Sequence, residues 1–177
     1  HRPGGWREPP QRGQLGSPFM DRTVPPRDRR SQALRANLQS MHRSGATVPC
    51  VGALVHSDDG RLLVVRRARP PGEGRWSVPG GRVEQDETDQ DAVRREVLEE
   101  TGLHVRVGVR VGTVLRPGLA GQTYDIRDYA CAPAVDTSPL AGDDAAEVRW
   151  VTRAELAELD LVDGLWACLH DWGMLPG

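Results

Sequence analysis

The stretch GRVEQDETDQDAVRREVLEETGL, residues 81–103, contains the clearest helical pattern in the chain. Thr88 has Asp91 three residues later, which is typical of a side chain that caps the first turn of a helix. Gly102 closes the segment, and glycine is the residue that most readily takes the left-handed conformation after a helix. The spacing therefore predicts a helix over residues 88–102.

Three glutamates share one face of this predicted helix. Glu99 and Glu100 follow Glu96 by three and four residues, so the three carboxylates project within about 100° of one another. Like charges so placed repel by about 0.3 kcal/mol per pair unless a cation lies among them. Such a face is often plain solvated surface, but an all-oxygen set of ligands also suits a hard cation such as Mg²⁺.

Residues 81–103 also resemble the signature of the Nudix hydrolase family: Gly, five residues, Glu, seven residues, Arg-Glu, an aliphatic, any residue, Glu-Glu, any residue, Gly, an aliphatic. The required positions are filled by Gly81, Glu87, Arg95, Glu96, Val97, Glu99, Glu100, Gly102 and Leu103. The preceding WSVPGG, residues 76–81, is similar to the family's usual approach to this signature. Asp86 stands where the family often has glycine, which puts a turn geometry in doubt rather than the chemistry.

The resemblance implies a set of roles for these residues. Glu96 and Glu100 would be metal ligands, and Glu99 would be a third ligand or the group that takes a proton from water. The expected ion is Mg²⁺, with Mn²⁺ as a possible substitute. Because glycine lets backbone approach a metal closely, carbonyl groups near Gly80 and Gly81 could join the coordination shell.

Two further groups are expected to support the site. Arg95 could reach Glu87 across the preceding loop, where a guanidinium–carboxylate fork would hold the loop against the helix. Some family members carry the general base late in the sheet, and the segment DDAAEVRW offers Asp143, Asp144 and Glu147 there. We predict Glu147 as the base, although all three could be ordinary polar surface residues.

Substrate contacts lie outside the signature and are predicted less directly. Four arginines precede it and could meet phosphates, although exposed arginines are commonly just solvated: Arg66, Arg67, Arg69 and Arg75. We select Arg66 and Arg75 as substrate contacts. Trp76 or Tyr124 could stack on a base, although aromatic residues in strands usually belong to the core, and Trp150, Trp166 and Trp172 are expected there.

Pro117 lies near a position where the ADP-ribose pyrophosphatase branch commonly has proline, and residues 47–177 are similar to that branch. The resemblance therefore implies hydrolysis of a phosphoanhydride bond, with ADP-ribose as the first candidate substrate and nucleoside triphosphates as the second. The alternative is a non-catalytic module that senses nucleotide sugars. That alternative is disfavoured because every required signature residue is present and no helix-turn-helix segment follows.

The rest of the chain divides at about residue 45. Residues 1–45 are rich in Arg, Pro, Gly, Ser and Gln and poor in paired apolar positions, so we expect a disordered extension or a non-native leader, with the true start at Met20 or Met41. A short helix over residues 31–42 is also conceivable. Residues 46–177 should form the folded domain.

Within that domain the pattern predicts strands, a helix, further strands and two helices. The β-forming runs 47–56 and 61–67 flank a turn, SDDG, and predict a hairpin. Residues 103–116, 121–134 and 147–151 predict three more strands. Thr152 and Glu155 form a capping box, and a last helix could dock Leu165, Trp166 and Leu169 on the sheet. This order is compatible with the α/β/α sandwich around a mixed sheet, an α/β (α+β) fold, that the resemblance implies.

The charge and composition of the chain limit the classes of partner that we expect it to bind. The chain has 23 Lys and Arg against 25 Asp and Glu, so no global positive field predicts binding to nucleic acid or to a membrane. Its three cysteines are widely spaced and suggest neither a disulfide framework nor a zinc site. We therefore expect a cytoplasmic monomer or homodimer that acts on a small nucleotide.

Overall fold

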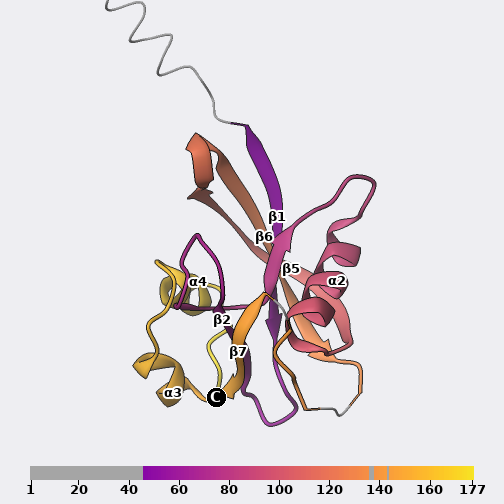
Figure 1. Ribbon diagram of the computed structural model, residues 1–177. Coiled ribbons are helices and arrows are strands. Elements are labelled where there is room, and N and C mark those ends of the chain that lie inside the picture. Colours follow the sequence, from indigo (N-terminus) through magenta and orange to yellow (C-terminus); the bar gives the residue numbers. More distant parts are fainter. Residues whose placement is uncertain (1–45, 136–137, 143) are drawn as a thin grey trace, which may run out of the picture. The chain divides into compact units, whose positions relative to one another are not determined.

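The computed structural model describes residues 46–135, 138–142 and 144–177 (Figure 1). The elements are β1 (Thr47–Val55), β2 (Leu62–Arg67), β3 (Trp76–Ser77), β4 (Gly80–Arg82), α2 (Asp89–Thr101), β5 (Val105–Pro117), the short 3-10 helix η1 (Leu119–Gly121), β6 (Thr123–Pro133), β7 (Ala145–Val151), α3 (Arg153–Glu158) and α4 (Leu165–Asp171). The predictions for residues 1–45, including the short helix over 31–42, lie outside the described residues.

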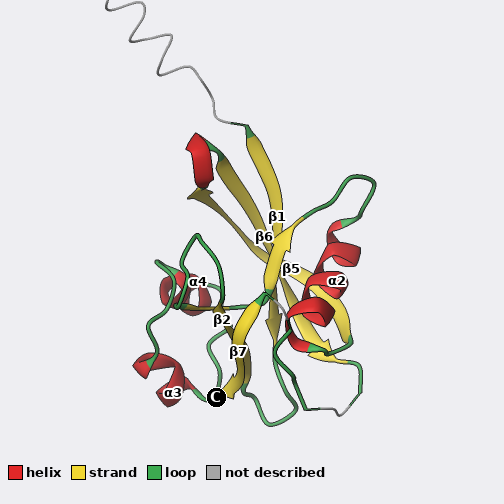
Figure 2. Cartoon of the chain, viewed as in Figure 1, coloured by secondary structure: helices red, strands yellow, loops and turns green. Residues whose placement is uncertain are grey.

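The strands form two sheets, as Figure 2 shows. In the larger sheet the order is β4-β1-β6-β5, with β1 and β6 parallel and the other neighbours antiparallel. In the smaller sheet the order is β3-β2-β7, and both pairs are antiparallel. The predicted mixed sheet is therefore confirmed, and β3, β2 and β7 form a second sheet.

The predicted hairpin between β1 and β2 is wrong. The two strands are joined only by an isolated bridge between His56 and Leu62, and β2 pairs with β3 and β7 instead. The reason is that β4 and β6 take both edges of β1 from Cys50 to Gly52. The chain therefore turns away after residue 56 and starts the second sheet.

Helices cover both sides of these sheets. Figure 1 shows α2 on one side and α3 and α4 on the other. Alternate residues of β1 serve two cores, because Ala53 and Val55 pack with Val93 of α2, whereas Leu54 packs with Leu169 of α4. The expected sandwich is thus formed, and the predicted docking of Leu165, Trp166 and Leu169 is confirmed. None of the helices in the described part of the chain combines the length and apolar character needed to cross a membrane.

The residues that were predicted to cap α2 do so in the structure. The Thr88 hydroxyl accepts a hydrogen bond from the Asp91 N–H, and Gly102 takes a left-handed φ of 68°. Asp86 also has a positive φ, 65°, which explains why glycine suits this position and why an aspartate can replace it. The buried stripe of Ala92, Val93 and Val97 fixes α2 on the sheet, so its glutamates face β4.

Candidate active site

Two glycines of β4 lie directly against the glutamates of α2. The Gly80 N–H donates to the Glu100 carboxylate at 3.0 Å. A Cβ on Gly81 would overlap the Glu96 carboxylate, and a Cβ on Gly80 would overlap the Val51 carbonyl. The missing side chain of Gly81 lets β4 approach the helix this closely, and the missing side chain of Gly80 lets it lie against β1.

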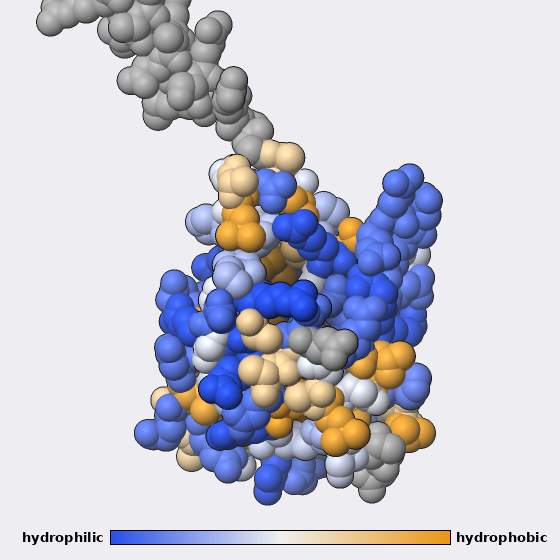
Figure 3. All heavy atoms as spheres, in the orientation of Figure 1, coloured by the Kyte–Doolittle hydropathy of each residue, from blue (hydrophilic) through white to orange (hydrophobic). Residues whose placement is uncertain are grey.

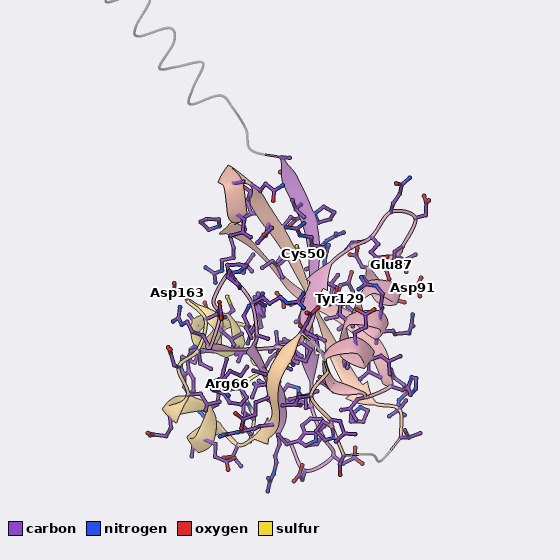
Figure 4. The ribbon with its side chains drawn as sticks, in the orientation of Figure 1. Cys50, Arg66, Glu87, Asp91, Tyr129 and Asp163 are labelled. Carbon is purple, nitrogen blue, oxygen red and sulfur yellow. The ribbon has the colours of Figure 1, made fainter. Side chains whose placement is uncertain are left out.

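A fork between Arg95 and Glu87 closes the loop that precedes α2, as the sequence predicts. Nε of Arg95 donates to one Glu87 oxygen at 3.0 Å, and Nη2 donates to the other at 2.9 Å. The same guanidinium donates to Glu96, to Glu99 and to the carbonyl of Arg82. One side chain therefore ties the loop, β4 and two of the helix glutamates together (Figure 4 labels Glu87 beside α2).

The carboxyl groups of this site differ in pKa and in exposure to solvent. Removal from water raises the pKa of Glu100 to about 7, and the Gly80 N–H opposes this only partly. Desolvation also raises the pKa of Glu96, whereas the hydrogen bonds from Arg95 lower the pKa of Glu87. Glu99 is different, because 60 % of its side chain is exposed. The pair Glu96 and Glu100 therefore forms the part of the site that would gain most from a nearby positive charge.

The residues present fit a hard divalent cation, although their side chains are not gathered around one point. No three His, Cys, Asp or Glu side chains converge on a single metal position within residues 46–135, 138–142 and 144–177. Glu96 and Glu100 nevertheless flank the same glycine pair, and Glu99 extends from the same face of α2. Carboxylate and backbone oxygens are the donors that Mg²⁺ or Mn²⁺ prefers.

Replacing Gly81 with alanine tests this close approach. The added Cβ should push the Glu96 carboxylate away from β4, because it would overlap all three carboxyl atoms. Since small misplacements at a reacting centre are costly, we expect kcat/KM to fall by about 100-fold. The measurement is steady-state hydrolysis together with Mn²⁺ affinity and Tm. Unchanged turnover and Mn²⁺ affinity in a folded variant would contradict the proposed role of this contact.

A pocket of about 580 Å³ begins beside these glycines. Gly80, Gly81 and Arg82 line it near α2, and Asp128, Leu165 and Trp172 line it near α4. Figure 3 shows the hollow on this face of the molecule, with hydrophilic residues around it. An apolar pocket with a few convergent polar groups is the usual form of a small-molecule site.

The expected substrate contacts divide into two groups. Arg75 and Tyr124 line the pocket, together with Arg67, and Arg75 is held there by Asp160 and Asp163. Trp76, by contrast, is only 6 % exposed and packs in the core under α3 and α4, with the Arg149 guanidinium over its ring. The sequence allows either a stacking ring or a core residue at this position, and the pairing of β3 with β2 turns the ring inward.

Arg66 and Glu147 lie together, away from the pocket lining. They face each other in register on β2 and β7, and Nε of Arg66 is 3.5 Å from the Glu147 carboxylate. Figure 4 shows Arg66 on β2, apart from Glu87 at α2. Asp144 lies closer to the glutamates, because its charge is among those that raise the pKa of Glu100. Asp143 lies outside the described residues.

Asp128 and Arg116 were missed by sequence reasoning, and both line the pocket. The signal for Asp128 was a carboxylate placed in β6 between Ile126 and Ala130 on the same face of the strand. Side chains of a strand alternate between two faces, so Asp128 falls on the same face as the apolar Ile126 and Ala130. A charged residue on such a face indicates a functional role. The role of Asp128 depends on which residues of β1 and β5 lie beside it.

Comparison with known proteins places the chain in a family. The model of the NUDIX domain matches residues 46–171. A Mycobacterium tuberculosis protein named "Putative 8-oxo-dGTP diphosphatase 2" is 43 % identical over 57 % of this chain and 71 % of its own length. An ADP-ribose pyrophosphatase of Methanocaldococcus jannaschii is 33 % identical over 57 % of this chain and 60 % of its own length.

Solved structures agree with the fold. The crystal structure of a MutT protein from Methanosarcina mazei superposes with a TM-score of 0.65, at 25 % identity, over 73 % of this chain and 94 % of that one. The chain therefore belongs to the Nudix family. Within that family it is an enzyme, a pyrophosphohydrolase.

Proposed function

We propose that this enzyme hydrolyses a phosphoanhydride bond in a nucleoside diphosphate derivative, with a divalent cation, Mg²⁺ or Mn²⁺, held by the signature residues. The observation that carries the proposal is the contact of Gly80 and Gly81 with Glu100 and Glu96, because the two glycines also line the pocket. It supports a site in which backbone and carboxylate oxygens meet the phosphates of a substrate whose nucleoside occupies the pocket.

Each signature residue has a part in this proposal. Glu96 and Glu100 would hold the cation with the backbone near Gly80 and Gly81, and Glu99 would either complete that set or accept a proton from the attacking water. Arg95 and Glu87 would position the loop and Glu96 without touching the substrate. A bound cation would polarise the phosphoryl oxygens and neutralise the charge of the leaving phosphate.

The residue that activates water is the least constrained part of the proposal. Glu147 is the candidate predicted from the sequence, but its carboxylate is engaged by Arg66 and Arg149. Asp144 is the better candidate on position, since its charge acts on Glu100 and it pairs only with the exposed Arg69 among the described residues. Comparison of Asp144→Asn with Glu147→Gln would separate the two.

Two compounds are the first candidate substrates to test. The sequence predicts ADP-ribose first, and the archaeal relative named an ADP-ribose pyrophosphatase supports it. The mycobacterial relative, which has the higher identity, supports an oxidised purine nucleoside triphosphate, 8-oxo-dGTP. Arg75, Tyr124 and Arg67 line the pocket and would contact either substrate.

Product release from a substrate panel tests the proposed function. The panel contains ADP-ribose, 8-oxo-dGTP, unmodified nucleoside triphosphates, dinucleoside polyphosphates and nucleotide sugars, each with Mg²⁺, with Mn²⁺ and with EDTA. We expect turnover of at least one nucleoside diphosphate derivative that EDTA abolishes and excess Mg²⁺ or Mn²⁺ restores. Tight binding of a nucleotide sugar without turnover of any compound would instead favour the sensing module.

A further inference from the structure

A single row of residues crosses all four strands of the larger sheet. Gly52 of β1 pairs in register with Gly80 of β4 on one side and with Asp128 of β6 on the other. Asp128 in turn pairs with Gly112 of β5. Three of the four positions are glycine, so Asp128 supplies the only side chain in the row.

Because Gly52 and Gly112 have no side chains, two groups that line the pocket can lie directly over them. A Cβ on Gly52 would overlap the Asp128 carboxylate, and a Cβ on Gly112 would overlap the ring of Trp172. The Asp128 side chain therefore lies across Gly52, and the indole lies across Gly112. Gly80, Gly52 and Asp128 of this row line the pocket, and so does the Trp172 ring that lies over Gly112.

Asp128 is buried without a partner that satisfies it. The residue is only 5 % exposed, and no hydrogen bond or ion pair joins its carboxylate to another group in the part of the chain that the structure describes. Its oxygens are not among the fully enclosed side-chain atoms that lack a partner, so they open onto the pocket that Asp128 lines. Arg116 is the nearest opposite charge that acts on it, but this guanidinium donates to the Cys168 sulfur. Because its oxygens face the pocket and accept no hydrogen bond from the described residues, a ligand in the pocket can supply the donors.

The spacing along the row matches the dimensions of a nucleotide. Asp128 and Gly80 are two strands apart, which is roughly 10 Å at the usual strand spacing. A nucleotide with its phosphates at Gly80 and Glu100 would therefore place the edge of its base near Asp128. The apolar residues between them, which include Val78 and Ile126, suit the faces of a base and a sugar.

We propose that Asp128 selects the base of the substrate, and that it accepts two N–H groups from a guanine-type edge. An ionised carboxylate only accepts hydrogen bonds, so it pairs best with two donors side by side. Guanine and 8-oxoguanine present such a pair on the Watson–Crick edge, whereas adenine presents one donor beside an acceptor. This proposal rests on the proposed function for the position of the phosphates, and it favours purine substrates of the guanine type over ADP-ribose.

The protonation of Asp128 agrees with this assignment. Burial raises the pKa of Asp128 to about 7, close to neutral pH. Two N–H donors would favour the ionised form and lower that pKa. Binding of a guanine nucleotide above neutral pH would thus involve little proton release.

The test measures binding, so it does not depend on turnover. Affinities for GDP and ADP with Mg²⁺ are determined by calorimetry for the full chain, for Asp128→Asn and for Asp125→Asn, a control on the other face of the same strand. We expect the unaltered chain to prefer GDP, and Asp128→Asn to lower the GDP-to-ADP affinity ratio by about 10-fold to 100-fold, because an amide presents a donor beside an acceptor. Asp125→Asn should leave the ratio unchanged.

Equal affinity for GDP and ADP, a preference for ADP, no binding of either, or an unchanged ratio in Asp128→Asn would overturn the proposal. Gly52→Ala offers a second variant, since its Cβ would displace the carboxylate and should also weaken the preference for GDP. A preference for GDP that depends on Asp128, in a protein that hydrolyses none of the panel, would retain this inference and reject the proposed function.

Discussion

Glu100→Gln is expected to lower kcat/KM for the nucleotide substrate by about 1000-fold while the chain stays folded. The amide can still accept the hydrogen bond from the Gly80 N–H, so the contact between β4 and α2 should survive. What is lost is the negative charge that would hold a divalent cation beside the phosphates. Steady-state hydrolysis with saturating Mg²⁺ measures the loss.

The stability of Glu100→Gln provides a second measurement, and we expect stability to rise while activity falls. The pKa of Glu100 is about 7 in the folded chain against an ordinary 4.5, so the folded state binds this proton more tightly than the unfolded state. The free energy of unfolding should therefore fall as pH rises from about 4.5 to about 7, and the penalty is fully present above that range. In EDTA at pH 8, Glu100→Gln should be more stable than the unaltered chain by about 2 kcal/mol.

Glu158→Gln is the matched control, since Glu158 is exposed on α3. It should change neither turnover nor Tm. Glu100→Gln that keeps near-normal turnover would remove Glu100 from the catalytic centre. A variant that loses activity and also melts at lower temperature in EDTA would show that the carboxylate serves the fold instead.

Arg95→Lys is expected to destabilise the chain by about 2 kcal/mol and to lower kcat/KM by about 10-fold to 100-fold. Arg95 donates five hydrogen bonds, and two of them form the fork with the largely buried Glu87. Lysine keeps the charge but cannot form a planar fork, so the loop and Glu96 should lose their fixed positions. Thermal or urea unfolding and steady-state kinetics measure the two effects.

The neighbouring Arg94 provides the control for this substitution. Arg94 is exposed and pairs only with Asp91, three residues before it on the same helix, among the residues described. Because exposed pairs contribute little, Arg94→Lys should change stability by less than about 0.5 kcal/mol and leave turnover intact. Equal effects of the two substitutions would show that the fork has no special role.

Much of the site could be predicted because its parts are close in the chain. Thr88, Asp91 and Gly102 set the ends of α2, and the fork joins Glu87 to Arg95 eight residues later. Helical periodicity alone places Glu96, Glu99 and Glu100 on one face. Their roles at a cation stay predictions, but their juxtaposition with the glycine pair agrees with the expected geometry.

Long-range pairing decided the features that were mispredicted or missed. A β-forming run shows that a strand exists but not which strand lies beside it, so β1 and β2 were expected as a hairpin although β1 pairs with the distant β6. The same limit applies to Trp76. Its residue type suits either a stacking ring or a core residue, and only the packing under α3 and α4 distinguishes them.

The sequence by itself determined the family signature, the capped helix with its acidic face, and the order of strands and helices, because each is a pattern within one continuous stretch of chain. The tertiary structure alone decided that Gly80, Gly52, Asp128 and Gly112 form one row. Those four residues come from four strands spread along the chain. Strand register, which depends on the side chains packed between the sheets and helices, brings them into one row, and three of them line the pocket.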